Sequence, residues 1–434
     1  MNHTAAIAMS GWIPTGLALF YFLPPRRAAL WGFLLAWMFL PFAAYRIEGL
    51  PDYTKMLATC GVVLLGAALF DFRHLLSMRP RLADLPIVLF CVCPLVSSLV
   101  NRLGVHEGLS ATFDSVITWG VPYAIGRLYF DSLEGLRSLA RGVGTAALAY
   151  VPLCLFELVR GPELHHIVYG SYPPFLDQEE RFGILRPMVF MNSGLMLAVW
   201  MAAGTVILAW LWRSRAISSR WQKWAAWSLP LMVATTVAVR SVNGWLLMTL
   251  GLGLLALHSY KASAAYLIVL TALVPLYVSL RAGGIWSGEQ AIPIVESLID
   301  ASKGRSILFR LENENMLIEN MQEHTVFGWG RQAAAVTGPQ GGLLIRDSLW
   351  IIAFTQFGAA GLAGLIGTLL VPIVVFMRCV PASRWLEASA APAAALAIVL
   401  LLYTLDDLAN GMVNPIYMLA AGGLAGLTKC HPTK

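Results

Sequence analysis

Long apolar runs recur along the whole chain and are separated by polar connections. An α-helix rises 1.5 Å per residue, so about 20 apolar residues cross the ~30 Å hydrocarbon core of a bilayer. A transmembrane barrel would instead show short segments of alternating apolar and polar residues. The pattern predicts an all-α, polytopic transmembrane helical bundle of about 12–13 spans. The runs lie near residues 5–23, 28–44, 56–70, 85–100, 111–130, 143–159, 188–211, 224–239, 244–258, 262–280, 348–376, 391–405 and 415–427.

One polar interval, residues 281–346, is far longer than any other connection. A hydrophilic segment of this length must lie outside the bilayer, because charged groups are costly in hydrocarbon. We therefore expect a large external loop. Between residues 305 and 321 its apolar residues recur with a period near 3.6, which predicts a helix lying on the membrane or on the bundle. The apolar face of this helix comprises Ile307, Leu308, Leu311, Ile318 and Met321, and Glu312, Asn313, Glu319 and Asn320 lie mostly elsewhere.

The composition agrees with a membrane bundle. Of the 434 residues, 58% are hydrophobic and 12% are charged, whereas soluble domains carry roughly 25% charged residues. We expect a single integral membrane domain over residues 1–434. The six cysteines fall within apolar runs or at their ends, which suggests no disulfide framework or metal cluster. The net charge of +6 is spread over the connections, so we expect no nucleic-acid partner.

Basic residues are concentrated in alternate connections. By the positive-inside rule, those connections face the cytoplasm. The complementary connections are then external, and they include residues 281–346, the loop before residue 188 and the turn at 406–414. Counting the predicted spans back from these connections places the N-terminus outside. The basic connections carry Arg26 and Arg27; Arg73, Arg79 and Arg81; Arg137 and Arg141; Arg213, Arg215, Arg220 and Lys223; Lys261; Arg378 and Arg384; and Lys429 and Lys434.

Several arginines lie where a predicted external connection meets an apolar run. Arg305 belongs to the segment Lys303–Ser306, which we expect to precede the helix of the long interval, so that free backbone amides and a cation face an anion. Arg240 lies between two runs and requires an acid, carbonyls, a ligand phosphate or a snorkelling position at the interface. Arg186 lies at the start of another run, and Arg181 precedes it in the same loop.

Carboxylates occupy comparable positions. Asp347 follows Arg346 where the chain returns to the membrane, and Asp406 and Asp407 close another run. A carboxylate at this depth could take a proton from an attacking hydroxyl. It could also cap a helix or pair with an arginine. We favour the functional interpretation for Asp347 and the structural one for the Asp406–Asp407 pair. The sequence contains no HExxH segment, Walker loop or nucleophile elbow.

Taken in order, these segments resemble the O-antigen ligase and polysaccharide polymerase superfamily of bacterial inner-membrane glycosyltransferases. Gly304–Arg305 matches the Gly-Arg pair of that family's loop. His324–Gly330 resembles its His-Pro, apolar, Gly-x-Gly motif with Thr325 in place of proline. Residues 347–361 resemble its re-entry motif, with Asp347 where the ligases usually carry histidine. Arg186–Pro187 with Asn192, and Arg240–Ser241, resemble two further span ends, so that the resemblance covers about residues 170–375.

The resemblance implies a fold like that of the GT-C glycosyltransferases and an active site facing the periplasm. Such enzymes transfer or polymerise a glycan from an undecaprenyl-diphosphate-linked donor onto an acceptor hydroxyl of a glycan, lipid or protein. They need neither a metal nor a cofactor, and they act in lipopolysaccharide or exopolysaccharide biosynthesis. Arginines suit the diphosphate leaving group because they bind its charge and stabilise the charge that develops.

The residue roles follow from the matched positions. Asp347 and Arg305 are the predicted catalytic residues, with Asp347 as the base that receives the proton of the acceptor hydroxyl. The predicted diphosphate-binding residues are Arg186, Arg240 and Arg305. The supporting candidates are Arg181, Arg331, Arg346 and Asp406.

Other classes of membrane protein fit parts of the pattern. A transporter or flippase of lipid-linked saccharides would also need cationic sites, but it would place them near the bilayer midplane and often shows repeats. An O-acyltransferase would need a buried histidine in a catalytic setting. A purely structural subunit would leave the outer arginines replaceable.

Overall fold

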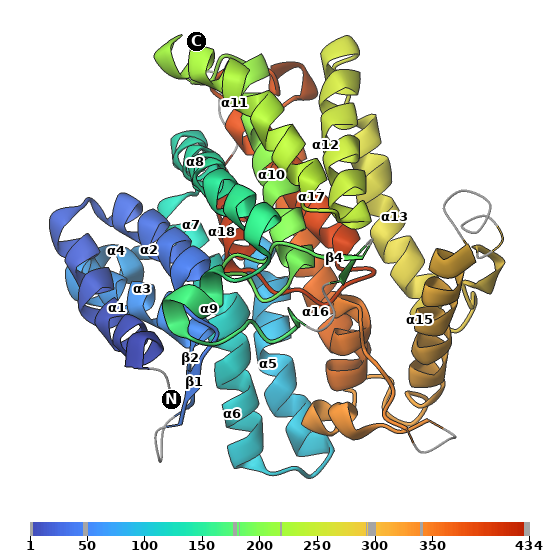
Figure 1. Cartoon of the computed structure of the whole chain (residues 1–434). Coiled ribbons are helices and arrows are strands. Elements are labelled where there is room, and N and C mark those ends of the chain that lie inside the picture. The colour runs from blue at the N-terminus through green and yellow to red at the C-terminus, as the bar shows by residue number, and fades with distance from the viewer. Residues whose placement is uncertain are drawn as a thin grey trace.

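The computed structural model describes residues 3–46, 51–176, 180–181, 183–217, 219–291, 293, 301–338 and 342–428. Side chains at 181, 184, 219–221, 291, 301–306 and 334 lie outside this description. Helices dominate the described chain (Figure 1), which confirms the predicted all-α fold. Strands form only two short antiparallel hairpins in this part of the chain. They are β1 (Ala44–Tyr45) with β2 (Tyr53–Thr54), and β3 (Glu180–Arg181) with β4 (Ile184–Leu185).

Every predicted apolar run coincides with helical structure. The corresponding elements are α1 (His3–Phe22), α2 (Pro25–Phe39), α3 (Lys55–Phe70), α5 (Leu85–Val100), α6 (Val105–Ser115) continued by η2 (Val116–Gly120) and α7 (Val121–Tyr129), α8 (Leu133–Arg160), α10 (Gly194–Arg213), α11 (Ser219–Ala238), α12 (Val242–Tyr260), α13 (Ala265–Ala282), α16 (Leu349–Cys379), α17 (Ala391–Asp406) and α18 (Pro415–Ala425). The shorter elements between them are α4 (Phe72–Ser77), η1 (Leu82–Asp84), α9 (Leu164–Tyr169), η4 (Glu289–Ala291), α15 (Ala301–Glu319), η5 (Gly330–Ala335) and η6 (Ala382–Arg384).

Seven of the described helices are long and apolar enough to cross a membrane: α1, α5 with the preceding turn, α8, α10, α12, α13 and α16. The apolar helices α3, α17 and α18 are shorter. Polar side chains begin several of these helices by accepting a backbone N–H. Thr54 begins α3, Ser193 begins α10 and Asn414 begins α18 in this way. The chain is therefore a membrane protein built as a polytopic helical bundle.

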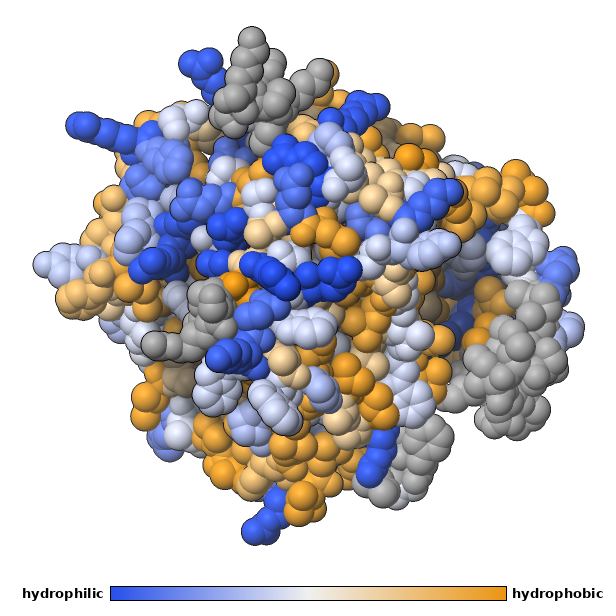
Figure 2. All heavy atoms as spheres, turned by 90° about the horizontal axis from the view of Figure 1, so that it is seen from above, coloured by the Kyte–Doolittle hydropathy of each residue, from blue (hydrophilic) through white to orange (hydrophobic). Residues whose placement is uncertain are grey.

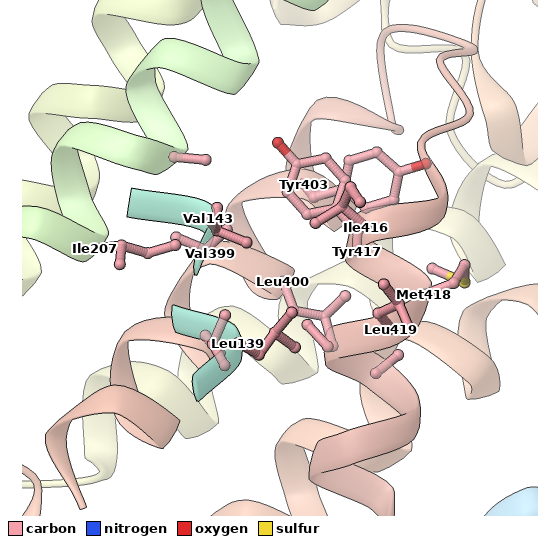
Figure 3. Packing of buried hydrophobic residues seen from close by; sticks show 14 of the residues in the cluster. Leu139, Val143, Ile207, Val399, Leu400, Tyr403, Ile416, Tyr417, Met418 and Leu419 are labelled. Atoms are coloured by element: carbon pink, nitrogen blue, oxygen red, sulfur yellow. The ribbon is translucent and has the colours of Figure 1, made fainter. Parts of the chain in front are cut away.

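The core lies where α8, α10, α17 and α18 meet (Figure 3). Helices α10, α17 and α18 are buried around almost their whole circumference, as their uniformly apolar sequences require. Leu139 and Val143 of α8 face Val399 of α17, which also lies near Ile207 of α10. By contrast, α1 and α13 expose many apolar side chains, as is typical of helices that face lipid.

The polar connections separate into two sets at opposite ends of the bundle. At the basic end, which is rich in Lys and Arg, Arg26 donates to the carbonyl of Tyr129, and Arg81 donates to that of Gly426. Arg137 likewise donates to the carbonyl of Ala388. All three contacts join connections that the charge pattern places on one face. Figure 2 looks onto this end from above Figure 1 and shows hydrophilic residues gathered across it.

The other set of connections is joined by its own contacts. Tyr53 donates to the carbonyl of Met9, and the backbone N–H of Phe42 donates to His165. Asn101 donates to the carbonyl of Gly328 from the long interval. The two-sided arrangement predicted from charge is thus present in the fold. Which end faces the cytoplasm stays a prediction.

The long polar interval is largely helical, and two local predictions within it are wrong. Helix α15 begins at Ala301, so Lys303–Ser306 lies inside the helix and not ahead of it. Lys and Arg are good helix formers, and a single glycine costs only about 1 kcal/mol relative to alanine. The face that α15 turns to the bundle is also partly polar, because Asn313 and Glu314 are buried beside Leu317 and Met321.

Candidate functional site

A polar cavity opens at the end of the bundle opposite the basic end. It consists of three hollows of about 270, 510 and 460 Å³, which share lining residues with one another. We call them together the shared cavity. Its walls come from the β1–β2 hairpin and the first turn of α3, from α6 with η2, from Arg331, and from the start of α16 with the 411–413 turn. Its polar lining includes Asp52, Lys55, Asp114, Asn192, Arg331 and Gln356.

Arg331 is the guanidinium of this cavity and lines two of the hollows. It is the second residue of the short helix η5, directly after Gly330. Its Nη1 lies 3.0 Å from a carboxylate oxygen of Glu107, and its Nη2 contacts the carboxylate of Asp114. Both acids belong to α6, and the arginine side chain is 44% exposed. Two half-exposed ion pairs stabilise the fold only modestly, but they hold the guanidinium at the cavity wall.

Lys55 is a second basic residue of the cavity, and sequence reasoning missed it. Its side chain is buried at the first residue of α3, and its Nζ donates to the carbonyl of Phe190 at 2.9 Å. The ammonium also lies 4.1 Å from the ring centre of Phe42 and 5.3 Å from that of Trp37. No carboxylate pairs with it among the residues that the structure describes. A buried cation without an acid is costly unless an anion joins it.

Helix α16 is broken beside the cavity. Gly358 has φ 63° and ψ −161°, a conformation that interrupts the helix. The backbone groups freed by the break bond to residues 325–329 of the long interval. The N–H of Ala359 donates to the carbonyl of Thr325 at 2.7 Å, and the N–H of Trp329 donates to that of Thr355 at 2.9 Å. Irregular backbone within a membrane helix persists only where other protein groups satisfy it.

Two glycines permit this contact. A Cβ at Gly358 would lie 2.3 Å from the carbonyl carbon of Val326, and a Cβ at Gly328 would lie 2.4 Å from that of Gln356. Both also have positive φ, which favours glycine. The two segments that carried the sequence resemblance, near 324–330 and 347–361, are therefore packed together. Gln356 at this junction lines the cavity.

Asp347 lies at the entrance to α16, next to this cavity. Its Oδ2 pairs with Nε of Arg310 at 3.3 Å, and both side chains are about two-fifths exposed, at 37% and 41%. The N-cap position of α16 is occupied by Ser348 and not by Asp347. The alternative that Asp347 caps this helix is therefore wrong. The backbone of Asp347 lies close to Gly411, which lines the cavity. The carboxylate of Asp347 is therefore ion-paired with Arg310 and still accessible to solvent.

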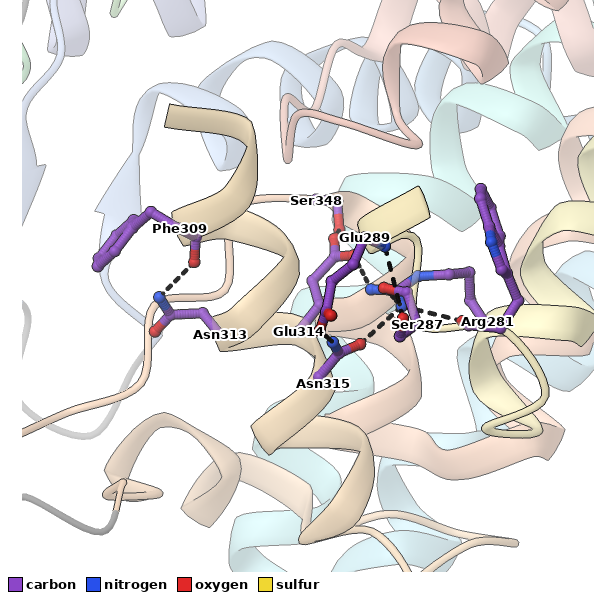
Figure 4. A network of polar contacts seen from close by, with 9 residues as sticks. Arg281, Ser287, Glu289, Phe309, Asn313, Glu314, Asn315 and Ser348 are labelled. Carbon is purple, nitrogen blue, oxygen red and sulfur yellow. Dashed lines mark hydrogen bonds and ion pairs between the residues drawn. The ribbon is translucent and has the colours of Figure 1, made fainter. Parts of the chain in front are cut away.

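A buried network fixes the position of α15 and hence of Arg310 (Figure 4). Nη2 of Arg281 lies 2.9 Å from a carboxylate oxygen of Glu314. The other oxygen of Glu314 accepts a hydrogen bond from Ser348 at 2.7 Å. Asn313 accepts from the N–H of Ile345 at 3.2 Å. The end of α13, the middle of α15 and the start of α16 are thus held together by polar contacts that the apolar periodicity does not reveal.

Asp406 and Asp407 lie at the C-terminal end of α17 and are buried. Asp407 is the C-cap residue of α17, and its backbone N–H donates to the carbonyl of Tyr403 at 2.9 Å. Its carboxylate is unfavourable there, because the carbonyl end of a helix is electronegative. Asp406 accepts hydrogen bonds from Asn243, the second residue of α12, and from Asn410. Neither carboxylate oxygen of Asp407 has a hydrogen-bond partner in the described part of the chain. The pair ties α12 to the turn that borders the shared cavity.

The other predicted arginines lie away from the cavity lining. Arg186 is buried in a segment whose following backbone is held by Glu157, which accepts from the N–H groups of Met188 and Val189 at 2.7 Å each. Arg240 occupies the turn between α11 and α12 with φ 59°. Neither lines the three hollows. The convergence of Arg186, Arg240 and Arg305 on a diphosphate stays a prediction.

Three further candidates complete the set. Arg305 lies in α15 and Arg181 in β3, but both side chains fall outside the described residues. Arg346 is half-buried, and its Nη1 has no hydrogen-bond partner among the groups that the structure describes. Burial lowers the pKa of Arg346.

No family model and no curated protein matches this chain.

Proposed function

We propose that this protein transfers a glycan from a polyprenyl-diphosphate donor onto an acceptor hydroxyl at the cavity end of the bundle. The observation that carries the proposal is that Arg331 and Lys55 line adjoining hollows of one cavity whose remaining walls are partly apolar. A diphosphate needs cations, and a polyprenyl chain needs an apolar route beside them. Met56, Leu57, Phe113 and Ile117 provide such a route along the hollow that Asp114 and Arg331 also line.

The reaction is a displacement at the anomeric carbon of the donor glycan. The acceptor oxygen forms the new glycosidic bond, the bond to the diphosphate oxygen breaks, and the diphosphate leaves with the electron pair. Fixed cations are most useful at this oxygen, where negative charge develops. Arg331 and Lys55 supply them from the cavity, and Arg186, Arg240 and Arg305 remain candidates for the outer part of the diphosphate site. The proton of the hydroxyl passes to a carboxylate, for which we propose Asp347.

A transporter or flippase of lipid-linked saccharides is the second candidate. The break in α16 favours it, because discontinuous helices line the substrate sites of many transporters. The two functions differ in their products. A transferase forms a glycosidic bond, whereas a flippase moves the intact donor from one leaflet to the other.

Purified protein in vesicles should be given a synthetic undecaprenyl-diphosphate oligosaccharide, alone and with lipid A–core acceptor, and the products sized by mass spectrometry. We expect a longer glycan or a glycosylated acceptor. Arg331→Ala should lower the rate by roughly 10²–10³, as expected when one group that stabilises a developing oxyanion is removed. Arg73→Ala, an exposed arginine of α4 at the basic end, is the control and should keep full activity. Movement of intact donor without a new bond would favour the flippase.

A further inference from the structure

A second cavity lies at the basic end, on the opposite side of the molecule from the shared cavity. It has a volume of about 430 Å³ and is enclosed by α8, α10 and α11 with the connection between the last two. Pockets of roughly 300–1,000 Å³ are typical of small-molecule sites. We call this space the α8–α11 groove. Its lining residues are Arg141, Gly144, Thr145, Leu148, Leu208, Leu211, Ile217, Trp224, Ala225 and Ser228.

The groove is polar at one end and apolar along its depth. Arg141 is the ninth residue of α8, and Leu148 lies seven residues further along, about 10 Å deeper at 1.5 Å per residue. On α10, Leu211 is near the basic end and Leu208 is one turn deeper. Trp224 lies near the start of α11 and is 67% exposed. Tryptophan in this setting is typical of the membrane–water interface.

The charge around the mouth of the groove is positive. One Nη of Arg141 donates to the carbonyl of Ala216, which places the guanidinium across the connection between α10 and α11. Arg213 ends α10, Arg215 lies in this connection and Lys223 lies near the start of α11, and all three are exposed. Glu134, the acid of α8 nearest to Arg141, pairs with Arg26. Glu387, next to the Ala388 carbonyl that Arg137 binds, pairs with Arg384. The mouth therefore complements an anion, and the depth complements an alkyl chain.

We propose that the α8–α11 groove binds an anionic phospholipid of the bilayer, with the phosphodiester at Arg141 and one acyl chain along Leu148 and Leu208. Along α8 the charged group lies nearer the basic end and the apolar surface lies deeper, and α10 adds Leu211 and Leu208 to that surface. A phospholipid of the adjacent leaflet has the same orientation. Basic pockets between membrane helices are recognised sites for anionic headgroups. The site is independent of the proposed glycan transfer, because it lies at the other end of the bundle.

The test is native mass spectrometry of the purified, delipidated protein titrated with phosphatidylglycerol or with phosphatidylcholine of the same chains. We expect tighter binding of phosphatidylglycerol and about a fivefold loss of that binding in Arg141→Gln, the change that corresponds to one contact of ~1 kcal/mol. Arg384→Gln removes the same charge at the same end outside the groove and is the matched control. Thr145→Trp fills the groove without changing the charge and should also lower the binding of phosphatidylglycerol.

Several outcomes would overturn the proposal. One is equal binding of the two lipids, and another is an equal loss in Arg141→Gln and Arg384→Gln, which would indicate a diffuse charge effect. Unchanged binding in Thr145→Trp would show that the lipid lies outside the groove. Displacement of bound phosphatidylglycerol by undecaprenyl phosphate at lower concentration would assign the groove to polyprenyl lipids instead. Melting temperatures measured before lipid is added establish that each variant is folded.

Discussion

The carboxylate of Asp347 pairs with Arg310 on α15, and its backbone lies beside Gly411 at the edge of the shared cavity. An ion pair whose partners are 37% and 41% exposed contributes at most about 1 kcal/mol to stability. A general base contributes far more to a reaction, typically 10²–10⁴ in rate. The two roles of this residue can therefore be separated by comparing stability with activity.

Asp347→Asn should fold normally, bind the lipid-linked donor as the wild type does, and lose transfer by about 10²–10⁴, because asparagine cannot accept the proton. Arg310→Ala is the control, since it breaks the same ion pair and leaves the carboxylate in place. Donor binding, melting temperature and initial rates are measured for both variants. Equal losses of activity in the two would mean that the ion pair, and not the base, is required. Full transfer in Asp347→Asn would refute the assignment.

His165 links the loop after α8 to the segment before β1. Its Nδ1 lies 2.5 Å from the carbonyl of Ser171, and its Nε2 accepts from the N–H of Phe42 at 3.3 Å, so the ring is held in the neutral form. Burial lowers its pKa, the carbonyl of Ser171 raises it in part, and the nearby Lys55 lowers it again. The folded protein consequently binds this proton less readily than the unfolded chain does.

Stability should therefore fall as the pH drops below about 6.5, the ordinary pKa of histidine, because the unfolded state then takes up a proton that the folded state resists. Thermal unfolding in detergent between pH 7.5 and 5 measures this slope. His165→Gln removes the titrating group and should flatten the slope, whereas the same substitution at the exposed His166 should leave it unchanged. A slope that persists in His165→Gln would assign it to other groups.

At the scale of elements, α15 is attached to the bundle by polar contacts more than by apolar ones. Arg281 is almost completely buried, and its ion pair with Glu314 crosses from α13 to α15. Removing one partner of a buried pair leaves an unpaired charge and typically costs 3–5 kcal/mol, whereas replacing both with apolar residues is often neutral. The pair therefore determines where α15 lies relative to Asp347.

Arg281→Leu and Glu314→Leu should each destabilise the protein by about 3–5 kcal/mol, and the double variant should recover much of that loss. Unfolding by denaturant gives the three values, and amide hydrogen exchange in α15 reports whether the helix detaches. The control Arg384→Leu breaks an exposed pair and should change stability by less than about 1 kcal/mol. Additive losses in the double variant would show that the two side chains do not act as a pair.

Sequence periodicity located the apolar helices but misplaced the polar ones. Each apolar run became a helix because burial in lipid or in the core requires every backbone group to be bonded within the segment. The buried face of α15 was missed because its polar residues Asn313 and Glu314 are buried only through partners outside the helix, Ile345 and Arg281. The site of Lys55 was missed for a similar reason. Its walls come from residues 42 and 190, which only the fold brings together.

At the scale of the whole molecule, the two ends of the bundle differ in chemistry. One end carries the basic connections and the α8–α11 groove, and the other carries the shared cavity and the long interval. The charge difference predicts the orientation, because basic connections are retained on the cytoplasmic side. We therefore expect the proposed transfer reaction on the periplasmic side.

Labelling of single cysteines in intact cells tests this orientation. In a background without the native cysteines, Gln322→Cys in the long interval should react with an impermeant maleimide from outside. Lys223→Cys, at the start of α11, should react only after the membrane is permeabilised. Both positions are exposed, so reactivity reports the compartment. The opposite pattern would place the shared cavity in the cytoplasm and would exclude glycan transfer at the periplasmic face.

The break in α16 also bears on how the chain is made. Residues 324–330 leave the ribosome before residues 349–379, yet they supply the partners of the broken turn at Gly358. A translocon that releases α16 sideways into lipid releases a helix whose amide groups at Ala359 and Ala360 bond only to the earlier segment. In the predicted orientation, biogenesis of this span is completed from the far side, when the long interval, already translocated, folds back onto the helix that follows it.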